Sequence, residues 1–476
     1  MSSEAVPPAP EDRDQVKHPV KAILVCAGAA VGGILFGFDS SAINGAVDAI
    51  GVEFRLSSGA LGFAVAIALL GCAVGAWFAG QLADLWGRRA VMVVSGIVFT
   101  ANSIGSALAG SDVELMIWRF IGGLAIGTAS VIAPDYIGEI APVKWRGALG
   151  SVQQLAITLG IFGALLSDAL LASGGGALQQ LWWGLEAWRW MLLVGVVPAV
   201  FYGIVALLIP ESPHYLIRKH RDKQAKHVLA DISGVDDTDA KVSEIRESFS
   251  SASRARYRDL RGPAFGLQPI LWIGMTVAAL QQLVGINVIF YYSTTLWQSV
   301  GFSTEDSFTT SVITAVVNVL TTLVAIGFVD RVGRRKLLLA GSVGMTLGLL
   351  ATAIAFSQSV DTGGGVSLPG GWGPVALIGA NLFVVFYGAS WGPVMWVTLG
   401  EIFPNRIRSL GLGIGAMVNW VFNFIITLAF PWVNTSLGPA FAYSAFTFFA
   451  FASFWFVKLA LPEFKGRDLE SGRIVQ

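Results

Sequence analysis

Residues 281–292 read Gln-Gln-Leu-Val-Gly-Ile-Asn-Val-Ile-Phe-Tyr-Tyr and lie inside an apolar run from about residue 267 to about residue 300. A polar group without a partner in hydrocarbon costs several kcal/mol, so these side chains have to face protein or a water-filled cavity. On one straight helix, Gln281 and Tyr292 share a face. Asn287 and Tyr291 then lie about 100° from that face, and Gln282 lies on another side. We therefore predict that the helix breaks near the central glycine, so that these residues form half of a solute site.

The composition is that of a polytopic membrane protein, since 54% of the 476 residues are hydrophobic and only 13% are charged. The formal net charge is zero, which gives no indication of a nucleic-acid partner. Cys26 and Cys72 lie in apolar runs, where packed thiols are expected and not a disulfide or a metal pair. All histidines lie in polar segments, which leaves an intramembrane enzyme without its usual catalytic base. We therefore predict no enzymatic activity, no metal site and no cofactor.

Twelve apolar stretches are long enough to cross a membrane core of about 30 Å at a rise of about 1.5 Å per residue. Six precede and six follow a polar block at about 211–262. That block carries basic residues followed by acidic ones, which suits short amphipathic helices or a solvated linker. The expected spans are 21–49, 59–82, 90–110, 114–137, 148–172, 188–209, 267–300, 307–329, 336–357, 373–399, 410–432 and 438–461.

Lysine and arginine gather on one side of the membrane if the spans alternate in direction. They cluster after the second, fourth, eighth and tenth spans, in the polar block and near both ends of the sequence. The positive-inside rule therefore places both termini and the polar block in the cytoplasm. The first twenty residues are polar and proline-rich, so we expect no cleavable signal peptide, and the first span has to direct insertion.

Two motifs recur in the two halves of the chain, which indicates a parallel internal duplication. Asp-x-x-Gly-Arg-Arg follows the second and the eighth spans, and Glu-Ile-x-Pro with a later arginine follows the fourth and the tenth. Ion pairs between such helix ends are individually weak, so a clamp built from them can break and re-form. The alternative, topology signals, explains the arginines but not the repeated acids. The predicted cytosolic gate residues are Asp84, Arg88, Arg89, Glu139, Arg146, Asp330, Arg334, Arg335, Glu401 and Arg408.

Several motifs, in order along the chain, resemble those of the sugar porters of the major facilitator superfamily, over residues 21–470. They are Gly-Gly-Ile-Leu-Phe-Gly-Phe-Asp at 32–39, both Asp-x-x-Gly-Arg-Arg loops, Arg-Phe-Ile-Gly-Gly at 119–123, Pro-Glu-Ser-Pro at 210–213, the 281–292 segment, and Pro-Glu-Phe-Lys-Gly-Arg at 462–467. Each motif is weak alone, but all of them in order between the expected spans are specific. Within that family, the chain most resembles the bacterial glucose–proton symporters.

The resemblance implies an all-α membrane protein of twelve transmembrane helices in two pseudo-symmetric six-helix bundles with a cytosolic helical insert. The implied parts are a tail at 1–20, a bundle at 21–210, the linker at 211–262, a bundle at 263–461 and a tail at 462–476. It also implies a monomer in the bacterial inner membrane that takes up a hexose, D-glucose in the first place, together with a proton. Its partners would be the sugar, the proton and membrane lipid, and no nucleic acid.

Carried over position by position, the resemblance implies a sugar site between the bundles, with Tyr291 and Tyr292 closing over it from outside. The residue types agree, because amides donate to and accept from hydroxyls and an indole covers the apolar face of a sugar ring. Each buried amide could instead bridge two helices, worth about 0.6–2 kcal/mol, and for Gln153 we expect that role. The implied sugar-site residues are Gln154, Gln281, Gln282, Asn287, Tyr291, Tyr292, Asn318, Trp396, Asn419 and Trp420.

An acid in the first span, Asp39, and a base near the start of the fourth, Arg119, are costly inside a membrane and usually have a function and a partner. In proton-coupled sugar porters the matching residues form a pair, and facilitators tend to carry a neutral residue in place of the acid. The resemblance therefore implies proton coupling through Asp39 and Arg119. Some coupled relatives carry a further acid in the sixth span, where this chain has Gly195.

Two other readings remain open at the level of sequence. A facilitator would carry sugar downhill without protons, and Asp39 is the feature that speaks against it. A sugar sensor that does not transport usually has a long cytosolic tail, whereas only about fifteen residues follow the last span here. Glucose, galactose, xylose and fructose all remain possible substrates.

Overall fold

The computed structural model describes residues 19–141, 146–235, 237–251, 257–361, 366–403 and 407–461. Within these ranges, twelve helices are long and apolar enough to cross a membrane. They fall where the sequence predicts spans, six before and six after the polar block, so the predicted all-α fold is confirmed. A pair of two-residue antiparallel strands, β1 (Val360–Asp361) and β2 (Val366–Ser367), is a small addition to it.

The first bundle holds six spans, of which the sixth is divided. Its helices are α1 (Pro19–Glu53), α2 (Ser58–Trp86), α3 (Arg88–Leu108), α4 (Asp112–Ile140), α5 (Arg146–Ala172) and the pair α6 (Ala187–Leu193) and α7 (Val196–Leu208). A short helix, η3 (Trp182–Gly184), precedes α6. Ser57 and Ser111 cap α2 and α4 by accepting hydrogen bonds from backbone N–H groups three residues later.

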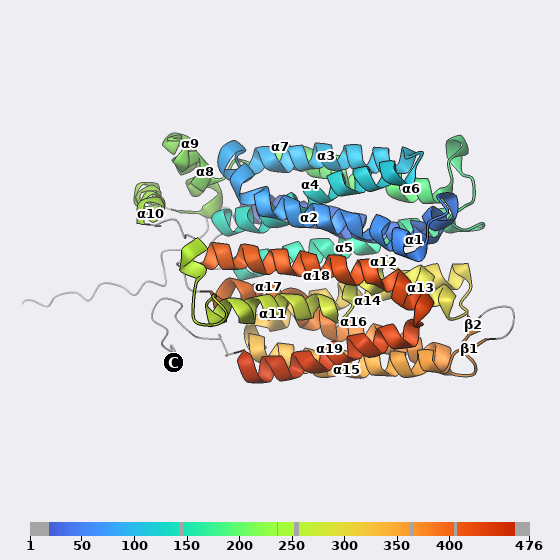
Figure 1. Cartoon of the computed structure of the whole chain (residues 1–476). Helices are drawn as coiled ribbons and strands as arrows, with labels where there is room; N and C mark the ends of the chain where they lie inside the picture. Colours follow the sequence, from blue (N-terminus) through green and yellow to red (C-terminus); the bar gives the residue numbers. More distant parts are fainter. Residues whose placement is uncertain are drawn as a thin grey trace, which may run out of the picture.

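The polar block forms the short helices α8 (Pro213–Arg218), α9 (Asp222–Val228), η4 (Leu229–Ser233), α10 (Thr238–Ser251) and η5 (Tyr257–Leu260). This confirms the amphipathic helices and excludes an unstructured linker over those residues. Lys21 of α1 forms an ion pair with Asp231 of η4 at 3.0 Å, so the insert is attached to the first bundle. We call the end of the molecule that carries α8–α10 the insert end (Figure 1).

The second bundle repeats the plan with a divided first span, α11 (Pro269–Leu283), α12 (Ile286–Tyr291) and α13 (Ser293–Ser299). Its other helices are α14 (Thr304–Val332), α15 (Arg334–Ser357), α16 (Trp372–Ala389), α17 (Trp391–Ile402), α18 (Arg408–Ser436) and α19 (Pro439–Ala460). Gly87 and Gly333 occupy the same place in the two halves, between two helices, with φ of 93° and 96°. A positive φ is costly for other residues, which explains why the repeated motif has glycine there.

Close helix contacts depend on small residues. A Cβ at Gly123 of α4 would collide with the carbonyl oxygen of Ala68 on α2, and one at Gly71 of α2 would collide with Phe120 O on α4. Without Cβ atoms the two backbones approach closely, which is how membrane helices associate when lipid is as apolar as their side chains. Large apolar side chains such as Ile97, Leu208 and Ile378 are exposed on the outside, as a lipid-facing surface requires.

The two bundles form two layers, with the insert helices at one end and β1 and β2 at the other (Figure 1). Between the layers, α2 packs on α18, α5 packs on α14, and α1 packs on α12 and α13. We call the end that carries β1 and β2 the opposite end. The layer boundary is where the resemblance places the sugar, so the residues on α1, α5, α11, α12 and α18 determine the site.

Candidate functional site

The predicted break in the seventh span is present. Gly285 separates α11 from α12 with φ of 81°, a left-handed conformation that favours glycine. The ring of Phe446 also lies 2.6 Å from where a Cβ of residue 285 would be. Both the backbone conformation and the packing therefore require glycine at this point.

The break brings four amide side chains into one hydrogen-bonded network. Asn287 donates to Gln282 Oε1 at 2.6 Å, and Gln282 donates to Asn419 Oδ1 at 3.0 Å. Asn419 donates to Gln281 Oε1 at 2.6 Å, and Gln281 donates to the carbonyl oxygen of Trp391 at 3.1 Å. We call Gln281, Gln282, Asn287 and Asn419 the amide network. Three helices, α11, α12 and α18, hold it.

The two tyrosines of the same segment point to other partners. Tyr291 accepts a hydrogen bond from Asn423 at 3.4 Å, and Tyr292 donates to the carbonyl oxygen of Thr427 at 2.9 Å. Both rings are buried. The break thus gathers the three amides of the segment, whereas its tyrosine hydroxyls bond to α18.

The remaining sequence-predicted sugar residues make no hydrogen bond to the amide network among the described contacts. Asn318 is buried with its Oδ1 3.3 Å from where a Cβ of Gly388 would be. Trp420 is buried and meets Phe36 of α1 edge to face at 5.1 Å, which links the two bundles. Gln154 is half-buried in α5, and Trp396 is exposed.

Gln153, the amide expected to bridge two helices, is buried in α5, and its Oε1 has no hydrogen-bond partner among the described residues. Its Nε2 lies 3.1 Å from where a Cβ of Gly33 would be, so the side chain packs against α1. The helices α1 and α5 cross closely at Gly33, and no described group there donates a hydrogen bond to Gln153 Oε1.

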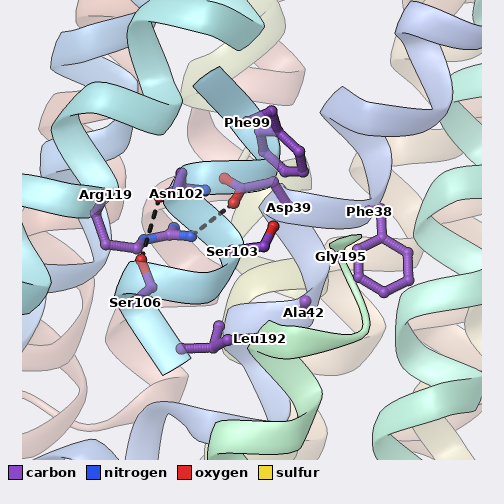
Figure 2. A pocket seen from close by; sticks show the side chains of 10 residues that line it. All are labelled: Phe38, Asp39, Ala42, Phe99, Asn102, Ser103, Ser106, Arg119, Leu192 and Gly195. Carbon is purple, nitrogen blue, oxygen red and sulfur yellow. Dashed lines mark hydrogen bonds and ion pairs between the residues drawn. The ribbon is translucent and has the colours of Figure 1, made fainter. Parts of the chain in front are cut away.

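The predicted intramembrane pair is formed. Arg119 donates to Asp39 Oδ1 at 3.0 Å, and the side chains are only 4% and 10% exposed. Figure 2 shows Arg119 and Asp39 pointing toward one another, with Asn102 and Ser106 of α3 beside them. Ser106 donates to Asn102 Oδ1 at 3.1 Å, which orients that amide next to the pair.

Small cavities lie on two sides of this pair. One is lined by Asp39 and Arg119 together with Asn102 and Ser106 of α3 (Figure 2). The other is lined by Asp39 and Arg119 together with Tyr291 of the second bundle. The ion pair therefore lies between the interior of the first bundle and a cavity at the layer boundary.

Gly195 joins α6 to α7 at the edge of the first cavity. A Cβ at this position would lie 2.8 Å from Ser103 Oγ and 3.1 Å from the carbonyl oxygen of Leu192. The surroundings are thus packed for a residue without a side chain, which fits the glycine that this chain has where some coupled relatives carry an acid.

At the insert end, Arg88 is buried and forms ion pairs with Glu139 at 2.8 Å, Asp135 at 3.2 Å and Asp84 at 3.6 Å. Glu211 accepts from the backbone N–H of Arg88 at 2.9 Å. Three of the predicted gate residues are thus in one cluster. Two further members of the cluster, Asp135 and Glu211, were not predicted. Their sequence positions were informative, since Asp135 precedes Glu139 by one helical turn and Glu211 lies in Pro-Glu-Ser-Pro.

Two predicted gate arginines bind backbone carbonyl oxygens at helix ends. Arg89 donates to the carbonyl oxygen of Leu207 at the end of α7, and Arg335 donates to that of Lys458 near the end of α19 at 2.7 Å. Free carbonyls at a helix end attract cations, so these two contacts agree with the helix-end charge that the predicted clamp includes, and no ion pair of either arginine with an acid is seen among the described residues. Arg334 is half-buried at the start of α15. The side chains of Arg146, Asp330, Glu401 and Arg408 lie outside the described residues.

Contacts at the opposite end, which the sequence analysis missed, join the two bundles. Thr294 of α13 donates from its backbone N–H to Asn44 Oδ1 at 3.1 Å and from its hydroxyl to Asn44 O at 2.9 Å. Thr295 donates to Asp48 Oδ1 at 2.9 Å. The available signal was a polar residue at every fourth position of α1, at Ser40, Asn44 and Asp48. These bonds hold the layer boundary closed at this end.

Comparison with known proteins now adds to this geometry. Residues 25–474 match the family described as "Sugar (and other) transporter". The chain is 46% identical to the glucose transport protein of Synechocystis sp. over 95% of its own length and 97% of that protein's. The chain belongs to this sugar transporter family. It is also 36% identical to the glucose transporter GlcP of Staphylococcus epidermidis, over 93% of this chain and 94% of GlcP.

Among solved structures, this sugar transporter resembles XylE of E. coli, a proton:xylose symporter of the major facilitator superfamily bound to 6-bromo-6-deoxy-D-glucose. The TM-score is 0.79 at 31% identity, covering 94% of this chain and 98% of XylE. The protein is thus a multi-pass membrane transporter and not an enzyme. Its divided seventh span carries three residues of the amide network, and the Asp39–Arg119 pair joins the first and fourth spans.

Proposed function

We propose that this sugar transporter takes up D-glucose together with a proton by alternating access. The single observation that carries the proposal is the buried ion pair of Asp39 and Arg119, beside a cavity that also touches Tyr291 of the other bundle. The names of the similar proteins support the substrates, since two are glucose transport proteins and one is a proton:xylose symporter.

The amide network is the proposed centre of the sugar site. Hydrogen bonds link its four side chains, and Asn287 joins the network as a donor to Gln282. A hexose hydroxyl both donates and accepts hydrogen bonds, as a carboxamide does. It can therefore take the place of one amide as the hydrogen-bond partner of another. Asn318 and Gln154 would add polar contacts, and the indoles of Trp396 and Trp420 would cover the ring.

Proton coupling would work through the pairing state of Asp39. When Asp39 is ionised it holds Arg119, and both charges stay compensated in a dry environment. When a proton neutralises Asp39, the attraction is lost and α1 is free to move relative to α4. Because α1 also bonds to α13 through Asn44, a change in α1 reaches the second bundle. The proton and the sugar shift the equilibrium between the two conformations only to the extent that each binds one conformation more tightly than the other.

Alternating access would then open the opposite end and close the insert end. The bonds of Asn44 and Asp48 to α13 hold the opposite end together in the conformation described. We assign the insert end to the cytoplasm of a bacterial cell by the positive-inside rule, so the closed end faces outward. With that orientation both termini are cytoplasmic, and the Arg88 cluster lies at the inner gate. A monomer is sufficient, because one chain contains both bundles.

The second candidate is a facilitator that equilibrates sugar without protons. The amide network alone supports it, since neutral amides bind a hexose equally well with or without a proton gradient. Purified protein in liposomes separates the two proposals by comparing labelled glucose uptake with and without an inward proton gradient, for wild type, Asp39→Asn and the exposed-acid control Glu305→Gln.

The symporter predicts accumulation above equilibrium in wild type and Glu305→Gln, and equilibration without accumulation in Asp39→Asn. If wild type gains nothing from the gradient, the facilitator replaces the symporter. If glucose is not taken up in any condition, the sugar assignment fails, and xylose, galactose and fructose are tested in the same vesicles.

A further inference from the structure

A second acid is buried in the first bundle and has no part in the mechanism above. Asp168, on the last turns of α5, has a relative exposure of 0%. Its Oδ2 accepts a hydrogen bond from the backbone N–H of Gly45 on α1 at 3.1 Å. Its Oδ1 is also buried and has no hydrogen-bond partner among the described residues.

The charged groups on the helices around Asp168 are engaged elsewhere or exposed. On α1, Asp39 pairs with Arg119 of α4, and Asp48 accepts from Thr295. On α6, Arg189 donates to Ala107 O and Ala109 O and pairs with Glu186. Among the acids in the first turns of α4 and α14, Asp112 is half-buried, and the exposed ones are Glu114, Glu305 and Asp306. Within the described ranges, no cation forms an ion pair with Asp168.

An ionised carboxylate in such a place would be a buried charge with one backbone hydrogen bond and no counter-ion. Burial disfavours the charged form strongly, and a single neutral hydrogen bond returns only a small part of the lost hydration. The neutral acid loses far less on burial. We propose that Asp168 is a second proton-binding site, and that it holds a proton while the opposite end of the transporter is closed.

The position of this site along the first bundle gives it a place in proton movement. Gly45 is six residues beyond Asp39 on α1, about 9 Å further along the helix axis toward the opposite end. Ala42, between them, lines the cavity beside Asp39 (Figure 2). A proton that enters when the opposite end opens therefore reaches the depth of Asp168 before that of Asp39. Asp168 is thus placed to take up and release a proton as that end admits and excludes water.

A purely structural role would make Asp168 a link between α5 and α1 through Gly45. Asparagine separates the two roles, because its carboxamide oxygen still accepts from Gly45 N and its size is almost the same, but it binds no proton. The infrared absorption of purified full-length protein in lipid membranes reads the protonation state directly, since protonated carboxyl groups absorb apart from carboxylates and amides.

At neutral pH we expect a protonated-carboxyl band in wild type that is lost in Asp168→Asn and retained in Asp39→Asn. If the Asp168→Asn difference spectrum instead shows the loss of carboxylate bands, Asp168 is ionised and the proposal is overturned. Asp168→Glu is the second variant, because it should shift the protonated band without removing it; a band that neither variant changes also overturns the proposal. The readout needs no sugar transport, so its failure is distinct from failure of the symporter.

Discussion

Two arginines are buried among the described residues of the first bundle, and their surroundings differ. Arg119 has one acid, Asp39, and both side chains are at most 10% exposed. Arg88 has three acids, of which Asp84 and Asp135 are 51% and 49% exposed and only Glu139 is as buried as the arginine itself. When one member of a single desolvated ion pair loses its charge, the other charge is left without a counter-ion. In a cluster with solvent access, the remaining acids and water still compensate the arginine. The first arrangement suits a switch, and the second suits a support that tolerates change.

The largest expected effect is that of Arg119→Gln. It leaves Asp39 as an uncompensated buried acid, so we expect a loss of about 3–5 kcal/mol of stability or a permanently protonated Asp39. Either result abolishes coupling, so glucose uptake into liposomes should reach equilibration without proton-driven accumulation, as for Asp39→Asn. The double variant Asp39→Asn/Arg119→Gln should unfold thermally within a few degrees of wild type. Wild-type accumulation by the single variant would remove the contrast between the two arginines.

Gly195→Asp would convert the single-acid arrangement into one with two acids near Arg119. The new Cβ meets Ser103 Oγ at 2.8 Å, so we expect a packing cost of about 1–3 kcal/mol, measured as a lower midpoint of thermal unfolding. Gly195→Asp/Ser103→Gly removes the clash and should recover at least half of that loss, with Ser103→Gly alone as the control. Equal loss in the single and double variants would show that packing at Ser103 is not the cause.

Glu139→Gln removes the most buried acid of the Arg88 cluster. Asp84 and Asp135 remain to compensate Arg88, so we expect a loss of only about 1–2 kcal/mol and transport within about tenfold of wild type. Thermal unfolding and the initial rate of glucose uptake check this prediction. A loss as large as that of Arg119→Gln would mean that the exposed acids provide no compensation, and that both arginines depend on one partner.

The smallest expected effect is that of Asp84→Asn. Half-exposed ion pairs contribute about 0–1 kcal/mol, and salt screens them further. Stability should change by less than about 0.5 kcal/mol, and the difference from wild type should shrink when the unfolding is repeated at high salt. An effect that grows with salt would exclude a screened ion pair as the role of Asp84.

Much of the site could be predicted because it depends on local rules. The helix break followed from amides on incompatible faces of one helix around Gly285. The cost of charge in a membrane indicated that Asp39 and Arg119 each have a partner, and the family resemblance implied that they pair with one another. The Arg88 cluster was predicted in part, because Asp84 and Glu139 recur in the second half as Asp330 and Glu401. Repetition, unlike composition, marks residues that share a structural role.

The contacts that the sequence does not reveal have one physical origin. Arg89 and Arg335 were predicted as gate residues, but the carbonyl oxygens of Leu207 and Lys458 that they bind were not. Thr294 bonds to the backbone as well as the side chain of Asn44, and Asp168 binds Gly45 through a backbone N–H. Backbone groups are present at every residue, so no sequence pattern indicates which of them a distant side chain will meet.

The sequence by itself determined the twelve spans, their division into two repeated halves, the break at Gly285 and the pair of intramembrane charges. These depend on hydropathy, on spacing along one chain and on the cost of polar groups in lipid, all of which are encoded locally. Only the tertiary structure decided that Asn419 completes the amide network, that Tyr291 shares a cavity with Asp39, and that Asp168 Oδ1 has no hydrogen-bond partner among the described residues. Those facts depend on how helices distant in sequence cross, and the crossing angles and depths are set by packing over their whole length.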